Sequence, residues 1–258
     1  MKSKMKKTRK PIAILTTLVM ILSLGSGVTM PRKAKAADHG LKNPTTDSNG
    51  VTTWDCVYFG NYYQSDATGT TKDPIKWRVL SVDGDDAFLL ADQNLDARSY
   101  NTSDKSVTWE NCTLRSWLNG YSASSNVENT DYSSGNFIDT AFTAAEQNAI
   151  KQTNVVNEDN PEYGTEGGND TMDQVYLLSI AEASSASYGF NSNYRTESKT
   201  REAKNTSYAK EQGAFTSTSA QCEGNGDWWL RSPGRNPGHY SEYFSVVTDY
   251  GCGISDCY

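Results

Sequence analysis

The chain of 258 residues contains only two histidines, His39 and His239. A zinc site or a Ser-His-Asp arrangement needs a histidine close to other metal ligands or to a nucleophile. Either arrangement would depend on His239 alone, because His39 falls in a polar segment near the amino terminus. No nucleophile motif lies beside His239, so the sequence does not support a zinc centre or histidine-dependent hydrolysis.

Basic residues are also scarce once the amino-terminal segment is set apart. Residues 1–36 carry 9 of the 24 Lys and Arg residues and none of the 31 Asp and Glu residues. The rest of the chain therefore has 15 basic against 31 acidic residues, a net charge of about −16. A surface of that sign repels phosphate backbones, so we expect no nucleic-acid partner.

The apolar stretch at residues 12–24 is shorter than the roughly 20 residues that a membrane-spanning helix needs. It follows a basic run at positions 2–10 and precedes the small-x-small sequence Ala34-Lys35-Ala36. This order is typical of a cleaved export signal. We therefore predict a signal peptide over residues 1–36 and a secreted or cell-surface protein with no transmembrane span after cleavage. The alternative is an uncleaved membrane anchor.

The chain has an odd number of cysteines, which in an exported protein leaves at least one thiol free or paired between chains. They are Cys56, Cys112, Cys222, Cys252 and Cys257. Cys252 and Cys257 are close enough in sequence for a local disulfide, and the other pairings stay open.

A polar linker at residues 37–50 leads into one domain at residues 51–258, rich in Tyr and Trp. Runs of β-branched and aromatic residues predict strands at 54–60, 74–82, 87–90 and 175–178 and a last hairpin at 243–254. Asp83-Gly84 begins the turn between the second and third of these strands.

Short helices are predicted between the strands. Leu114, Trp117 and Leu118 repeat at helical spacing before Gly120, a residue that favours a helix end. Capping boxes predict two further helices, one from Thr143 through residue 150 and one from Ser179. We expect another helix near residue 208.

The segment from Asp227 to Gly234 has the strongest strand character. Trp228 and Trp229 point to opposite faces of a strand, which predicts burial between two layers. Arg231 would then need a carboxylate or several carbonyls as partners. As an alternative, Trp228 and Arg231 would bind a ligand together with His239 from the following loop.

An acidic, glycine-containing loop at residues 157–170 is longer than a simple connection needs. Asp159, Glu162, Asn169 and Asp170 supply closely spaced oxygen ligands of the kind that calcium prefers. They are candidate calcium ligands, and calcium is the single cofactor that we consider. The alternative is a solvated loop without a metal.

Several blocks appear together in one order. They are Tyr58-Phe59-Gly60, Pro74-Ile75-Lys76-Trp77-Arg78-Val79-Leu80, Leu114-Arg115-Ser116-Trp117-Leu118-Asn119, Gly168-Asn169-Asp170-Thr171 and Trp228-Trp229-Leu230-Arg231-Ser232-Pro233-Gly234. The series resembles DUF6273, a family of secreted or cell-surface domains known mostly from Firmicutes. The family in turn resembles a C-type lectin-like fold, which sulfatase-modifying enzymes share. This implies an α+β fold with short helices packed on small antiparallel sheets and with long loops.

Such domains close with a strand that carries a Gly-Val-Arg-Pro-like motif, and no such motif follows residues 253–255 here. The closing strand is therefore expected to be missing, with an open sheet edge near residues 54–60.

The resemblance implies a non-catalytic recognition module for an extracellular glycan or protein. One alternative is an oxidase, because Cys252 and Cys257 have the spacing of the redox-active pair in sulfatase-modifying enzymes. The other is a purely structural surface domain.

Overall fold

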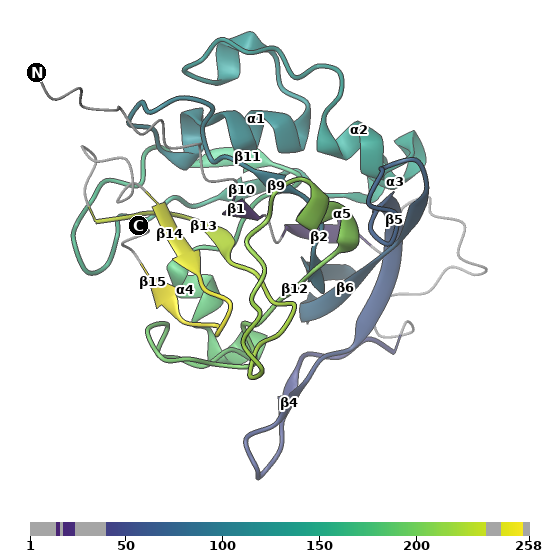
Figure 1. The fold of residues 1–258 in the computed structure, drawn as a ribbon, viewed down its shortest axis with the longest axis vertical. Coiled ribbons are helices and arrows are strands. Elements are labelled where there is room, and N and C mark those ends of the chain that lie inside the picture. The colour runs from purple at the N-terminus through teal and green to yellow at the C-terminus, as the bar shows by residue number, and fades with distance from the viewer. Residues whose placement is uncertain (1–13, 16–17, 24–39, 236–243, 255–258) are drawn as a thin grey trace, which may run out of the picture.

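The computed structural model describes residues 14–15, 18–23, 40–235 and 244–254, and it combines small, mostly antiparallel sheets with short helices (Figure 1). The strands are β1 (Ile14–Leu15), β2 (Val19–Ser23), β3 (Thr45–Thr46), β4 (Thr52–Thr53), β5 (Cys56–Tyr63), β6 (Lys72–Asp83), β7 (Asp86–Ala91), β8 (Gln93–Asn94), β9 (Ala97–Arg98), β10 (Thr153–Val155), β11 (Thr171–Asp173), β12 (Lys204–Asn205), β13 (Trp228–Pro233), β14 (Phe244–Val247) and β15 (Gly253–Ile254). The α-helices are α1 (Thr113–Asn119), α2 (Phe137–Ala141), α3 (Ala144–Ala149), α4 (Ile180–Ala183) and α5 (Ser207–Glu211). The 3-10 helices are η2 (Trp109–Asn111), η3 (Ala123–Ser125) and η4 (Ala186–Tyr188). An α+β class is thereby confirmed.

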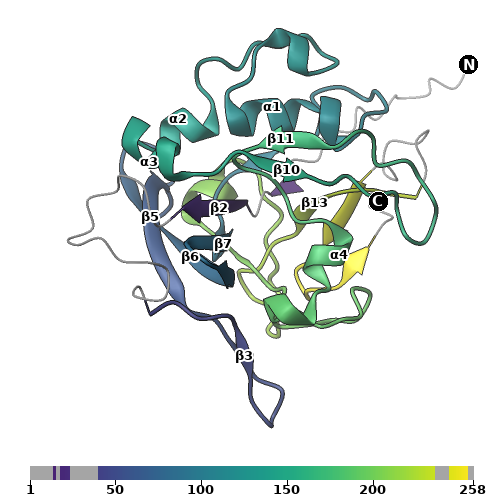
Figure 2. The same cartoon turned by 180° about the vertical axis from the view of Figure 1, so that it is seen from behind.

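Two larger sheets form the centre of the molecule, one in the order β2-β7-β6-β5 and one in the order β15-β14-β13-β1-β9. Helices α1, α2 and α3 lie at one end of the sheets, and α4 lies toward the other end (Figures 1 and 2). The hairpin predicted at Asp83-Gly84 is confirmed, since Asp83 pairs with Asp86 across it. Gly84 has a φ of 58° there, a conformation that favours glycine. The strand predicted at 54–60 forms as β5, at one edge of its sheet.

Strand β13 confirms the buried double-tryptophan segment. Trp228 and Trp229 are only 1% and 6% exposed. Their indole N–H groups donate to the carbonyls of Arg201 and Arg98, both at 3.0 Å. Because each ring is buried and hydrogen-bonded, β13 is a core strand with side chains packed on both faces.

Residues from the predicted signal peptide also form strands. Strand β2 pairs antiparallel with β7, from Val19 opposite Leu90 to Ser23 opposite Asp86. Strand β1 pairs with β13 in parallel and with β9 in antiparallel orientation. The apolar residues of β2 thus belong to the core of the described structure.

The predicted helix ends at three places are confirmed. Gly120 follows α1 with a left-handed φ of 69°. Both capping boxes are present, at Thr143 before α3 and at Ser179 before α4. The predicted helix near residue 208 is α5.

The strand predicted at 175–178 is wrong, because that segment has one isolated bridge, between Tyr176 and Val19. The carbonyl of Leu177 accepts from the Arg231 side chain at 2.8 Å, and that of Leu178 accepts from the Arg231 main chain at 2.9 Å. These carbonyls therefore bond β13 without a regular ladder.

The predicted linker at 37–50 contains half of a small arm, the β3–β4 hairpin, which projects from the body (Figure 1). Thr45 and Thr53 lie with their hydroxyl oxygens 3.1 Å apart, and Thr46 and Thr52 lie 2.9 Å apart. Cross-strand threonine pairs of this kind stabilise a short ribbon. Within the described residues, none of the helices is both long and apolar enough to cross a membrane.

Candidate functional site

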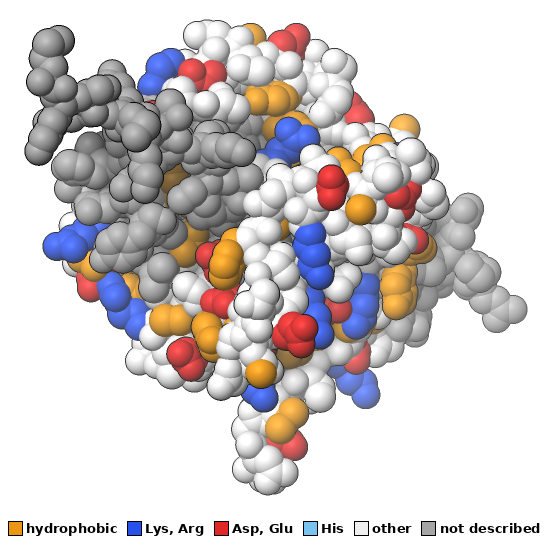
Figure 3. All heavy atoms as spheres, in the orientation of Figure 1, with side chains coloured by type: hydrophobic (Ala, Val, Ile, Leu, Met, Phe, Trp, Pro, Cys, Tyr) orange, Lys and Arg blue, Asp and Glu red, His pale blue; other side chains and the backbone are white. Residues whose placement is uncertain are grey.

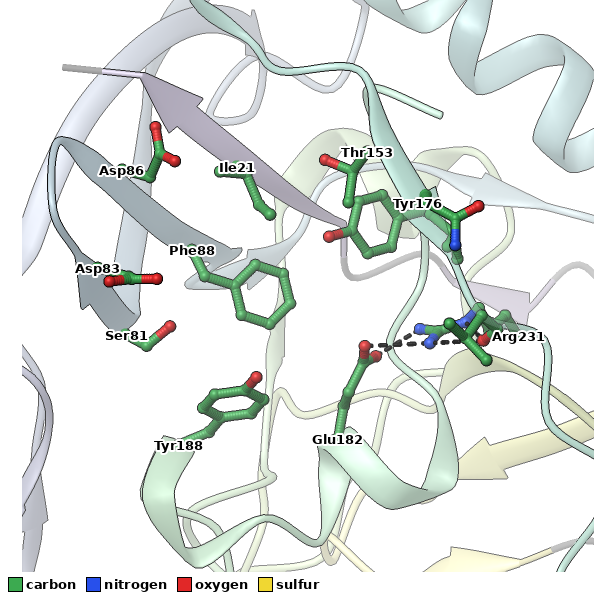
Figure 4. A pocket seen from close by; sticks show the side chains of 13 residues that line it. Ile21, Ser81, Asp83, Asp86, Phe88, Thr153, Tyr176, Glu182, Tyr188 and Arg231 are labelled. Atoms are coloured by element: carbon green, nitrogen blue, oxygen red, sulfur yellow. Dashed lines mark hydrogen bonds and ion pairs between the residues drawn. The ribbon is translucent and has the colours of Figure 1, made fainter. Parts of the chain in front are cut away.

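A pocket of about 330 Å³ opens where strands β2, β6, β7 and β10 approach α4 and η4 (Figure 4). Its size falls within the range of small-molecule sites. Its lining residues are Ile21, Ser81, Asp83, Asp86, Phe88, Thr153, Asn154, Val155, Val156, Tyr176, Glu182, Tyr188 and Arg231.

Three aromatic side chains line the apolar part of this pocket. The ring of Phe88 stacks on Tyr176 at a centroid distance of 6.1 Å. Tyr188 meets Phe88 edge to face at 5.3 Å. Phe88 and Tyr176 are buried, whereas Tyr188 is half-buried. Burial raises the pKa of Tyr188, and the nearby Glu182 carboxylate raises it further, so its hydroxyl stays protonated at neutral pH.

Arg231 and Glu182 form the charged part of the pocket wall. The two side chains form an ion pair in which Arg231 is 5% exposed and Glu182 is 24% exposed. Burial alone would lower the pKa of Arg231, but the Glu182 carboxylate holds it above its ordinary value. The Arg231 guanidinium therefore stays charged beside Glu182.

All five N–H groups of Arg231 are used within the protein. Two donate to Glu182, two to the carbonyl of Val156 and one to the carbonyl of Leu177. An arginine has five such donors, so none is left for a ligand carboxylate. Arg231 thus acts by holding Glu182 against the pocket.

The rim is acidic and hydroxyl-bearing. Asp83 is exposed, and Asp86 forms an ion pair with Lys151. Ser81 and Thr153 add hydroxyl groups to the pocket lining (Figure 4). An aromatic wall with carboxylates and hydroxyls around it suits a neutral or positively charged polyol better than an anion.

The predicted ligand-binding residues have different positions. Arg231 lies in the pocket wall, whereas the Trp228 ring is buried in the core and hydrogen-bonded to Arg201. His239 lies outside the described residues. The structure therefore places one of the three at the pocket.

The four candidate calcium ligands each have another partner. Asp159 accepts from the N–H of Gly167, Glu162 pairs with Arg195, Asn169 donates to Glu110, and Asp170 accepts from the N–H of Asn157. In the part of the chain that the structure describes, no three His, Cys, Asp or Glu side chains gather as a metal site would need. Calcium binding at this loop stays a prediction.

The cysteines Cys56, Cys112, Cys222 and Cys252 carry free thiols in the structure. Cys257 lies outside the described residues, so the predicted bridge to Cys252 and the oxidase that would use it stay predictions. Burial raises the pKa of the Cys252 thiol, which makes it a weaker nucleophile at neutral pH.

Sequence reasoning did not identify the pocket. The sequence indicates Glu182 only as the acidic residue of the capping box that begins at Ser179, and it indicates Phe88 and Tyr176 only as members of the strands predicted at 87–90 and 175–178. The useful signal was the requirement that a buried Arg231 find a carboxylate, together with a capping Glu182 directly after an apolar run. Tyr188 had no signal, because its position depends on the turn that follows α4.

The face drawn in Figure 3 has acidic and basic side chains interspersed, and its described residues form no continuous basic stripe.

A family model described as a domain of unknown function (DUF6273) matches residues 84–257. No curated protein and no solved structure matches the chain.

Proposed function

Since the chain belongs to the DUF6273 family, whose description assigns no function, we propose one from the pocket: a non-catalytic module that binds an extracellular glycan. The observation that carries the proposal is the aromatic wall of Phe88, Tyr176 and Tyr188 beside the fixed Glu182 carboxylate. A sugar ring has an apolar face for such a wall and hydroxyls for the carboxylate.

The charge arrangement supports a neutral or amino-substituted sugar. Arg231 has no N–H group left for an acidic sugar, and Asp83 adds negative charge at the rim. A uronic or sialic acid would meet like charge in a partly desolvated site, which is unfavourable.

A binding role fits the state of Glu182 better than a catalytic one. Its carboxylate accepts from the N–H of Ser179 at 2.8 Å and from Arg231. A general acid or base must exchange a proton with its substrate, and these bonds hold the group as an acceptor. The proposed role therefore uses Glu182 to orient hydroxyl groups.

The proposal includes a C-type lectin-like arrangement and a secreted or cell-surface location. Short helices on small antiparallel sheets, with long polar loops, support the first. The signal-like order of basic and apolar residues near the amino terminus supports the second.

A glycan array with the purified full chain, which keeps Ile21 in the pocket wall, tests the function. We expect binding to neutral or amino-substituted glycans and none to acidic ones. Binding to acidic glycans alone would contradict the pocket assignment. Silence on the whole array would contradict glycan binding and favour a protein partner.

A further inference from the structure

Strand β2 is held by main-chain hydrogen bonds on both sides. On one side it pairs with β7, and the N–H of Ala91 donates to the carbonyl of Leu18 at 2.9 Å. On the other side Val19 and Tyr176 exchange two bonds, at 2.8 and 3.0 Å. The N–H of Lys151 also donates to the carbonyl of Ile21 at 2.8 Å. A strand bonded on both sides fills a slot between two segments that do not pair with each other here.

The side chains of this strand are buried on both of its faces. Leu18, Val19, Met20 and Leu22 are 1%, 0%, 0% and 5% exposed, and Ile21 faces the pocket. A strand with apolar residues on both faces is typical of a sheet interior. A charged side chain at residue 19 or 20 would lie in the core without a partner, so the slot selects an uncharged apolar segment.

Removal of this strand would leave the slot open. The main-chain groups of Val19 form hydrogen bonds with Tyr176, and residues 19–23 pair with β7. Without β2, Tyr176 and β7 would lose these main-chain hydrogen bonds. Buried main-chain donors and acceptors need partners, and an unpaired strand edge accepts another strand.

The same residues belong to the apolar stretch of the predicted export signal. Cleavage after Ala36 would separate residues 14–23 from the rest of the chain, and both strands would be lost from the exported molecule. In any one molecule, this segment is therefore either kept as a core strand or removed during export.

We propose that the slot between β7 and the Ile150–Tyr176 side is an acceptor site for a β-strand. Its ligand is an uncharged, extended apolar peptide segment of about the length of β2, bound antiparallel to β7. In the intact chain, residues 18–23 occupy the site. After they are cut off, a peptide segment of the same chemistry replaces them.

The test uses the full chain with a specific protease site placed between residues 24 and 39, outside the described part. The folded protein is cut and unfolded, the cut-off amino-terminal fragment is removed, and the remainder is refolded with a fluorescent peptide of the sequence of residues 18–23, made soluble by terminal lysines. We expect one peptide to bind per protein and to restore the Tm of the uncut chain. Equal Tm without peptide, together with no peptide binding, would overturn the proposal.

A matched peptide checks that the slot recognises side chains. Met20→Asp in the peptide places a charge at the fully buried position, and we expect at least a 100-fold weaker Kd. Ile21→Asp places the same charge at the neighbouring position, which faces the pocket, and we expect a loss of less than 10-fold. Equal losses from the two peptides would mean nonspecific apolar binding and would overturn the proposal.

This inference does not depend on the glycan proposal. If the peptide binds and no glycan does, the acceptor-site proposal stands and the glycan proposal fails. If a glycan binds and the peptide does not, only the acceptor-site proposal fails.

Discussion

The carboxylate of Glu182 caps the first turn of α4 and at the same time pairs with Arg231 on β13. It accepts from the N–H of Ser179 at 2.8 Å and from an Arg231 N–H at 3.0 Å. One side chain therefore fixes a short helix to the central core strand and forms part of the pocket wall. A helix of four residues has little stability of its own, so this contact largely determines where α4 lies.

Glu182→Gln should lower the free energy of unfolding by about 2–3 kcal/mol. The change removes the carboxylate and leaves the buried Arg231 charge without its counter-ion, which is costly in a partly buried pair. Urea denaturation of the variant and the parent protein measures the difference.

Glu146→Gln is the matched control for this prediction. Glu146 occupies the same place in the capping box of α3, and its carboxylate caps Thr143 at the surface. We expect a cost below about 1 kcal/mol, which is typical of a surface cap. Equal costs for the two variants would show that the Arg231 pair adds nothing beyond capping.

Arg201→Lys should cost about 3 kcal/mol or more. Arg201 is 1% exposed. Its N–H groups donate to the carbonyls of Ala183, Asn191, Asn193, Tyr194, Thr196 and Gly251. A lysine has three donors and no planar fork, so some of these buried carbonyls would lose their partners, at about 1–3 kcal/mol each.

Arg195→Lys provides the comparison for the buried arginine, because its pair with Glu162 is 42% and 39% exposed. An exposed pair contributes at most about 1 kcal/mol. Thermal unfolding of both variants gives the two costs, and a larger loss for Arg195→Lys would contradict the expected order.

Asp227 should make stability fall with rising pH. The pKa of Asp227 is raised to about 6, mainly by burial. The hydrogen bond from the N–H of Asp249 lowers this pKa, and the negative charge of Asp249 raises it. The folded protein therefore binds this proton more tightly than the unfolded chain does. Its contribution is fully present below pH 3.8 and is lost as the pH rises to about 6.

Asp227→Asn removes this titration and keeps an oxygen that can accept from the N–H of Asp249. Relative to the parent, the variant should gain about 2 kcal/mol between pH 4 and pH 7. Urea denaturation at the two pH values measures the gain, with exposed Asp104→Asn as the control. A gain that is equal for both variants would assign the effect to overall charge.

Tyr188→Ala should weaken binding of the glycan found on the array by about 10-fold or more. Tyr188 is the half-buried ring of the pocket wall, and an aromatic pair contributes about 0.5–1.5 kcal/mol beyond its buried area. Calorimetric titration gives the Kd. Tyr58→Ala, at a ring that is 67% exposed on β5, should leave it unchanged.

Local sequence signals predicted much of the fold. The turn residues of the β6–β7 hairpin, Gly120 after α1 and both capping boxes act over a few residues, so sequence alone identifies them. The burial of Trp228 and Trp229 also followed from their adjacency in a strand.

The failures involve contacts that no local signal encodes. The segment at 175–178 has strand composition, but its carbonyls bond Arg231 and β13 in place of a ladder. The β3–β4 hairpin lies in a polar stretch that shows no strand signal. The pocket brings together Ile21, Phe88 and Tyr188 from distant parts of the chain. Their assembly depends on tertiary packing, which overrides local propensity.

The pairing of Leu15 with Trp228 has a kinetic consequence. The first residues to be synthesised are partners of strands made much later, and β13 comes close to the end of the chain. Contacts between such distant segments raise the contact order and slow the rate-limiting step. A nascent chain therefore leaves its five-stranded sheet unfinished until synthesis is almost complete, whereas all strands of the β2-β7-β6-β5 sheet are already made by residue 91.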